Sequence, residues 1–330
     1  MDPVTHTAVG FAIAQTGAKR LTPNWAWVMF FAASAPDVDG IFFLPGNVNI
    51  LDGHRHFTHS IFFAPLMALA TVIGVKYVLR REIHFRGAFL LALLGVLAHD
   101  AVDLLTFRGT RILLPFSDEF YAVQIQSFFD PVLYLLLALA FAIPFLSNLV
   151  SGEIGGRRSS GAITASIILV LCLGWFGIRY SFREQALSEL SSRIYNGVAP
   201  RRIDVLPSFH PLKFTGFVAG DSFQKIIPVN LLEFFDPEDG QTLFDEVPSV
   251  EAGKALRIAS TTHSAQVFLA WARWPRPSVT RYDGATRWVV VFEDLVADVN
   301  KTRPRVVIRL DERLAIQSEV YERSKGSTGF

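Results

Sequence analysis

The sequence predicts an α-helical membrane domain over residues 1–183, with about six helices, followed by a small β-rich soluble domain over residues 184–330. Hydrophobic residues make up 51% of the chain and the mean hydropathy is +0.34, which is high for a soluble protein. Long uncharged runs occur only before residue 181, whereas the later residues form short strand-like runs between Pro, Gly and Asp turns. This uneven distribution indicates a membrane region first and an extramembrane region second.

The composition also excludes several classes of protein. The single cysteine, Cys172, lies in an apolar run, so neither a disulfide framework nor a thiolate metal site is expected. A net charge of +1 without a basic stripe argues against nucleic-acid binding. Residues 6–17 are apolar but lack the preceding basic residues and the cleavage site of a secretory signal, so we expect the N-terminus to be retained.

The first two helices are expected to be short. Residues 4–17 form an apolar run that ends at Gly17, and Thr22-Pro23 then supplies a plausible cap and first turn for a helix over residues 24–35. Neither run is long enough to cross a bilayer fully. Longer spans follow at about residues 60–79, 87–105, 130–150 (with a kink expected at Pro144) and 161–180.

Beyond residue 183 the pattern changes. Residues 185–195 predict a short amphipathic helix that leaves the membrane. Strands are then expected at residues 225–235, 254–259, 266–274, 287–292 and 305–310, and the tail from Ser324 is expected to be disordered.

Basic residues indicate the orientation of the membrane domain. They cluster in alternate connections, at Lys19 and Arg20, at Lys76, Arg80, Arg81 and Arg86, and at Arg157 and Arg158. Because Lys and Arg are enriched in cytoplasmic loops, we expect a multi-pass protein of the bacterial inner membrane with both termini and the soluble domain on the periplasmic side. The ionisable residues at the helix ends then collect at the outer face of the membrane.

The most unusual stretch is the run from His54 to Ser60, which places three of the eight histidines within six residues just before an apolar span. One interpretation is a polar cap at the level of the lipid headgroups, formed by Arg55 together with His54, His56 and His59. The other is a set of metal ligands.

A second unusual stretch lies inside the apolar run of residues 87–105. Ionisable groups in a membrane helix are costly and mark a site by default. His99 and Asp103 stand at i and i+4, on one helical face, which suits two ligands of one metal ion or a histidine oriented by a carboxylate. Asp100 points about a quarter-turn away and could act as an outer acid or a bridging ligand. The alternative is a hydrogen-bonded His–Asp pair that holds helices together.

His6 and the turn Pro36-Asp37-Val38-Asp39 are weak signals individually, but they fall on the same side of the predicted bilayer. Imidazole and carboxylate ligands without Cys suit Zn²⁺, Mn²⁺ or Fe²⁺, and their number exceeds what one tetrahedral ion needs. We therefore predict one or two divalent ions, Zn²⁺ first and Mn²⁺ as the alternative. The predicted ligands are His6, Asp37, His54, His59, His99 and Asp103, with Asp39 and Asp100 as bridging or catalytic acids.

These residues resemble a known family. His6, the Asp37–Asp39 turn, the His-Arg-x-x-Thr-His-Ser motif and His99-x-x-x-Asp103 resemble the membrane-bound metal-dependent hydrolase family named for YdjM, which is distantly similar to zinc-dependent phospholipase C. The resemblance covers about residues 1–150 and extends to residues 207–218, similar to a segment that opens the extracytoplasmic part of longer members. His56 departs from the family pattern, which has a small residue there, and is either an extra ligand or a local substitution.

The resemblance implies hydrolysis, and the position at the lipid–water boundary favours an amphiphilic substrate such as a phosphoester or a lipid-linked ester. The expected partner is the lipid bilayer, and nucleic acid is not expected. Two alternatives remain at this point: a transporter or ion-handling protein that uses the same ligands as a transit site, and a catalytically silent member with a structural metal. The substrate, the oligomeric state, the protein partners and the role of the second domain stay open.

Overall fold

The computed structural model describes residues 2–42, 48, 51, 53, 55–153, 161–244, 249–283, 286–296 and 302–325. The chain forms two compact units. The first comprises residues 1–38, 55–217 and 227–240, and the second comprises residues 39–54, 218–226 and 241–330.

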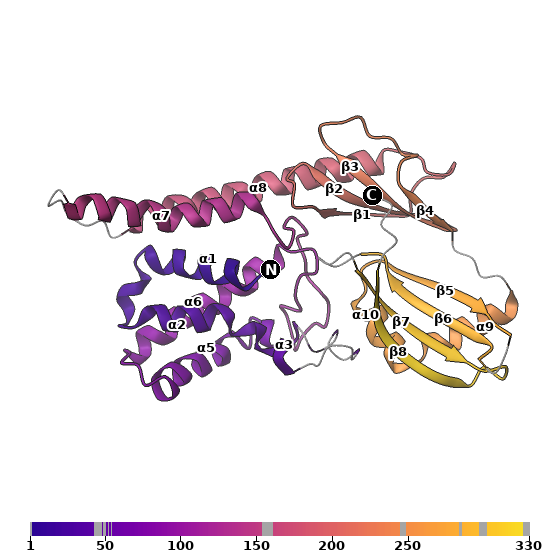
Figure 1. Ribbon diagram of the computed structural model, residues 1–330, viewed down its shortest axis with the longest axis horizontal. Helices are drawn as coiled ribbons and strands as arrows, with labels where there is room; N and C mark the ends of the chain where they lie inside the picture. Colours follow the sequence, from indigo (N-terminus) through magenta and orange to yellow (C-terminus); the bar gives the residue numbers. More distant parts are fainter. Residues whose placement is uncertain are drawn as a thin grey trace. The chain divides into compact units, whose positions relative to one another are not determined.

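Four helices of the first unit pack as a bundle (Figure 1): α1 (Pro3–Gln15), α2 (Trp25–Ser34), α5 (Ala64–Ile73) and α6 (Phe85–Leu104). Their core is rich in alanine, and glycine lies at the closest approaches. A Cβ atom on Gly95 of α6 would lie 2.9 Å from both the Cβ of Ala32 and the Sδ of Met29 on α2. Small residues allow helices in a membrane to approach closely, so this contact brings the ends of α2 and α6 together.

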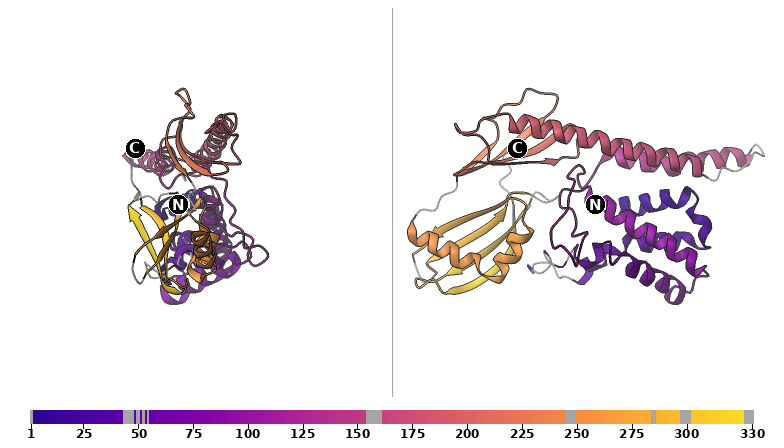
Figure 2. Two further views of the ribbon diagram at one scale, coloured as in Figure 1. Left: turned by 90° about the vertical axis from the view of Figure 1, so that its right-hand side faces the viewer. Right: turned by 180° about the vertical axis from the view of Figure 1, so that it is seen from behind.

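The other two helices of this unit, α7 (Pro131–Glu153) and α8 (Ala162–Ser191), run side by side as a long pair (Figures 1 and 2). Asp130 caps α7, because its Oδ1 accepts hydrogen bonds from the backbone N–H groups of Val132 and Leu133, each at 3.0 Å. By length and composition, α6, α7 and α8 can each cross a membrane. α7 continues through Pro144.

Two helical boundaries differ from expectation. The separate amphipathic helix predicted over residues 185–195 is wrong, since α8 continues unbroken to Ser191. The reason is local: no Gly or Pro interrupts residues 178–191, so helix propagation carries on when the side chains become polar. The span expected from residue 60 begins at Ala64, and α5 is followed by a π-helical turn, η4 (Gly74–Val78).

The described C-terminal residues form two four-stranded sheets, which confirms a helical membrane region followed by a β-rich part. The first sheet has the order β1-β2-β3-β4, formed by β1 (Arg202–Pro207), β2 (Lys213–Ala219), β3 (Phe223–Asn230) and β4 (Gln241–Phe244). The second is an antiparallel meander of β5 (Pro275–Arg281), β6 (Trp288–Asp294), β7 (Thr302–Leu310) and β8 (Ile316–Lys325). Helices α9 (Val250–Ser260) and α10 (His263–Trp271) cover one face of the second sheet (Figure 2).

The strands predicted at residues 254–259 and 266–274 are therefore wrong, because these residues lie in α9 and at α10. The helices start at side-chain caps, where Ser249 accepts a hydrogen bond from Ala252 N and Thr262 accepts one from Ala265 N. The buried positions of α9 are Ala252, Ala255 and Ala259, a helical spacing that short apolar runs can hide. The tail expected to be disordered from Ser324 is part of β8 as far as Lys325.

Candidate metal centre

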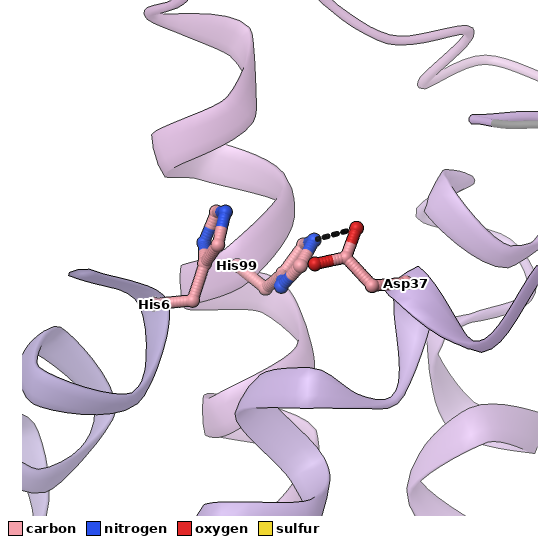
Figure 3. Close-up of side chains that lie close together, drawn as sticks. All are labelled: His6, Asp37 and His99. Carbon is pink, nitrogen blue, oxygen red and sulfur yellow. Dashed lines mark ion pairs between the residues drawn. The ribbon is translucent and has the colours of Figure 1, made fainter. Parts of the chain in front are cut away.

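Histidine and aspartate side chains converge at one end of the four-helix bundle. His6 lies in the first turns of α1, Asp37 in η2 (Pro36–Val38) just after α2, and His59 at the end of η3 (Phe57–His59) before α5. His99 and Asp103 lie in the last turns of α6. Figure 3 shows His6, Asp37 and His99 meeting from three separate elements. The start of α1 is fixed by Asp2, whose Oδ1 caps Thr5 N at 3.0 Å, so His6 faces the bundle interior and is buried.

His59 and His99 form the centre of this cluster. Their Nε2 atoms lie 3.3 Å apart. Asp37 Oδ1 lies 3.6 Å from the Nε2 of His59 and 3.7 Å from that of His99. Asp103 Oδ2 lies 3.6 Å and 3.9 Å from the same two nitrogens. Ligand atoms bound tetrahedrally to one Zn²⁺ lie about 3.4 Å from one another. The two Nε2 atoms and either carboxylate oxygen therefore form a triangle of about the size expected for three ligands of one ion.

The hydrogen bond at Nδ1 of His99 directs the lone pair of its other ring nitrogen inward. His99 Nδ1 lies 2.8 Å from the backbone oxygen of Ala33, which can only accept, so Nδ1 carries the proton and Nε2 carries the lone pair in a neutral ring. His59 Nδ1 lies 3.1 Å from the Thr58 hydroxyl. Metal-bound histidines are oriented in this way by a partner on the other ring nitrogen. The two Nε2 atoms, 3.3 Å apart, either share a hydrogen bond, with the proton on His59, or both present lone pairs to a bound metal ion.

His6 extends the cluster on the other side of Asp103. Its Nε2 lies 3.3 Å from Asp103 Oδ1, and its ring stacks on that of His99 with centroids 3.7 Å apart and an interplanar angle of 17°. The two oxygens of Asp103 therefore face different imidazoles, as in a bridging carboxylate. His6, Asp37 and His99 form one group with ligand atoms within 4.8 Å of one another, and His59, His99 and Asp103 form another. The donor set thus fits one ion at the centre and offers ligands for a second.

Arg55 takes part in the cluster, which the sequence reasoning did not foresee. Its Nη2 lies 3.0 Å from Asp103 Oδ2, and its Nη1 donates to Gly109 O at 3.0 Å and to Thr106 Oγ1 at 3.3 Å. The Thr106 hydroxyl in turn donates to the backbone oxygen of Asp103 at 2.7 Å. Arg55 therefore holds the Asp103 carboxylate in place instead of meeting lipid headgroups. The signal for this role was its position inside the His-Arg-x-x-Thr-His-Ser motif.

Asp37 is an anionic member of the cluster at neutral pH. Burial works against its ionisation, but the adjoining imidazoles of His59 and His99 together hold its pKa down to about 2. A carboxylate that is already deprotonated can bind a divalent cation without releasing a proton.

The remaining predicted residues are placed as follows. Asp100 is 1% exposed, and neither of its carboxylate oxygens has a hydrogen-bond partner among the described residues. Asp39 is buried at the start of α3 (Asp39–Phe42) and belongs to the second unit. His54 lies outside the described residues. His56 packs its ring against Phe57, with centroids 4.3 Å apart, and the two ligand groups found among the described residues do not include it.

Comparisons with known proteins agree with the membrane assignment. The model of the family described as "YdjM inner membrane protein" matches residues 1–184. The chain is 26% identical to the uncharacterized protein YfhP of Bacillus subtilis (strain 168) over 208 residues, which are 60% of this chain and 59% of that protein. It is 33% identical to the inner membrane protein YbcI of Escherichia coli (strain K12) over 126 residues, 35% of this chain and 68% of that protein. No solved structure matches.

Proposed function

This chain belongs to the YdjM inner membrane protein family, and we propose that it is a membrane-bound metal-dependent hydrolase that acts on a phosphoester or a lipid-linked ester. One observation carries the proposal: at one end of a membrane helix bundle two imidazole Nε2 atoms lie 3.3 Å apart, and each lies 3.6–3.9 Å from an oxygen of both Asp37 and Asp103. The family description and the names of the relatives state no activity. The chemistry of the donor set, in this chain, is what supports hydrolysis.

The residues divide into a binding group and a proton-handling group. A divalent ion, Zn²⁺ or Mn²⁺, would be held by His59, His99, Asp37 and Asp103. His6 would either interact with Oδ1 of Asp103 or bind a second ion. The bound ion would supply a Lewis acid and lower the pKa of a coordinated water. Arg55 and the Ala33 carbonyl hold Asp103 and His99 in the binding geometry.

Asp100 is our candidate for proton acceptor. It follows His99 directly in α6, it is buried, and its carboxylate oxygens make no hydrogen bond to the described residues. A carboxylate in that state can take the proton released by an attacking water. Asp39 stays a second candidate for this step on the grounds of the sequence alone.

The location of the site supports an amphiphilic substrate. His99 and Asp103 lie in the last turns of α6, a helix long and apolar enough to cross a membrane, so the site falls near one surface of the bilayer. The alternation of basic clusters supports a periplasmic site and second domain. A reporter enzyme fused after Phe330 and active only outside the cytoplasm tests this orientation, and activity of a cytoplasm-specific reporter contradicts it.

The test of function is metal analysis of detergent-purified protein, followed by a panel of phosphodiesters, phospholipids and lipid-linked esters. We expect bound metal and chelator-sensitive hydrolysis, and we expect His99→Gln to lose both. The matched control is His84→Gln, because the His84 side chain is exposed and its backbone makes the hydrogen bonds: the N–H donates to Thr22 and the carbonyl accepts from Ala88 N. Bound metal without hydrolysis of any substrate would favour a structural metal or an ion-transit site. Absence of metal would refute the proposal.

A further inference from the structure

An exposed apolar patch lies next to the metal centre, outside the helices. It consists of Ile61, Phe62, Leu113 and Phe116 and is called here the Phe62–Phe116 patch. The side chain of Phe116 is 78% exposed and that of Phe62 is 52% exposed, and their rings touch with centroids 4.9 Å apart. The two segments are joined by a hydrogen bond from Ile61 N to Ile112 O at 3.1 Å. Two large aromatic side chains in contact with each other and open on their outer sides mark an interaction surface.

The patch continues the lipid-facing surface of α5. From Phe62, exposed apolar side chains follow at helical spacing at Leu66, Ile73 and Tyr77. The ten residues of α5 and the five of η4 rise only about 22 Å, which is less than the hydrocarbon thickness of about 30 Å. Ile61 and Phe62 lie just before the first residue of α5, so the patch extends the apolar surface of this short helix at its N-terminal end.

The other half of the patch lies in the connection between two membrane spans. Leu113 and Phe116 belong to residues 105–130, which join the end of α6 to the start of α7. Both helix ends lie at a boundary of the membrane, so their connection lies there as well. Two residues after Phe116 the polarity changes, since the Asp118 side chain is 73% exposed. A bilayer surface between positions 116 and 118 would leave Phe116 in the acyl chains and Asp118 in water.

We infer that the Phe62–Phe116 patch is immersed in the acyl chains of one bilayer leaflet and completes the apolar span of α5. His59 lies two residues before Ile61, so the immersed patch places the metal centre within reach of a molecule whose tail stays in the bilayer. That consequence for the substrate rests on the proposed function. The immersion itself depends only on the exposed apolar surface and the length of α5.

Depth measurements with a fluorescent label test the inference. The single cysteine is buried, so Cys172→Ala provides a background. Phe116→Cys, Leu66→Cys and Asp118→Cys are each labelled with the environment-sensitive fluorophore NBD and reconstituted into phosphatidylcholine vesicles. We expect the label at 116 to be quenched by lipids that carry a nitroxide on the acyl chain, as strongly as the label at 66. Iodide in the water should quench the label at 118 several-fold more than the label at 116.

A label at 116 that iodide quenches as strongly as the label at 118 would overturn the inference. Phe62→Cys provides an independent measurement on the other ring of the patch and decides the matter if Phe116→Cys does not reconstitute. Metal content measured on the same preparations keeps the two proposals apart. A metal-free protein with an immersed patch would refute only the hydrolase, and a metal-loaded protein with an aqueous patch would refute only the immersion.

Discussion

Asp103→Asn separates a metal ligand from a helix-packing residue. The substitution keeps the shape of the side chain and one carbonyl oxygen, but it removes the negative charge that faces three imidazoles and Arg55. Substituting a residue that only orients a metal ligand typically lowers metal affinity about 10- to 100-fold. If Asp103 binds the metal directly, its substitution should lower the affinity by more than about 100-fold, which is about 2.7 kcal/mol. The Arg55 guanidinium also loses a charged acceptor at 3.0 Å, which should destabilise the metal-free protein by about 1.5–3 kcal/mol.

The assay measures bound metal and thermal stability on the same preparation, with and without a chelator. A ligand present at about 100 times its Kd stabilises the folded state by about 2.7 kcal/mol, so metal removal should lower the Tm of the wild-type protein. In Asp103→Asn the chelator should have no effect, since little metal is bound beforehand. The variant should also unfold at a lower temperature than the chelated wild type, because Arg55 has lost its charged partner.

An unchanged metal content in Asp103→Asn, together with the wild-type chelator shift, would contradict a role as metal ligand. Asp103 would then serve only the hydrogen bonds of Arg55 and the neighbouring histidines. The matched control is again His84→Gln, which should keep both the metal and the chelator shift.

Three further predictions follow from other contacts. Arg55→Gln removes the charge that positions Asp103 and should weaken metal binding by about 10- to 100-fold, measured by competition with a chromogenic chelator; wild-type affinity would show that Arg55 only anchors its loop. Gly95→Val should destabilise the helix bundle by about 1–3 kcal/mol in a detergent melt, because the added Cβ would overlap Ala32 and Met29. The control Gly74→Ala should melt like the wild type, because a Cβ atom at position 74 has no neighbour within 4 Å. Burial raises the pKa of Tyr195, whose hydroxyl donates to Leu190 O at 3.0 Å, to about 12. Its contribution to stability is complete below the unfolded pKa of about 10 and is lost as the pH rises through about 12, so Tyr195→Phe should lack this alkaline component in a pH series of melts.

Composition and hydropathy are enough to predict the order of the two regions and most of the membrane helices. A bilayer requires long uncharged runs, and such runs can be read directly from composition. The sequence also indicates which residues could form a site. Placing His99 and Asp103 in an apolar membrane helix costs free energy, and the fold does not need them there. Short segments with mixed patterns are harder to assign: residues 254–259 and 266–274 fit a strand period as well as a helical one, although they lie in α9 and at α10.

The arrangement of the candidate ligands, in contrast, depends on tertiary packing. His59 and His99 are 40 residues apart, and His99 and the Ala33 carbonyl that orients it are 66 apart. Neither spacing carries a periodic signal: the Ala33–His99 contact depends on how closely α2 and α6 pack around Gly95, and the meeting of the two Nε2 atoms depends on the packing of α5 against α6. The partner of Arg55 was hidden for the same reason. Local sequence selects which side chains are able to bind, and the packing of distant helices decides which of their atoms face one another.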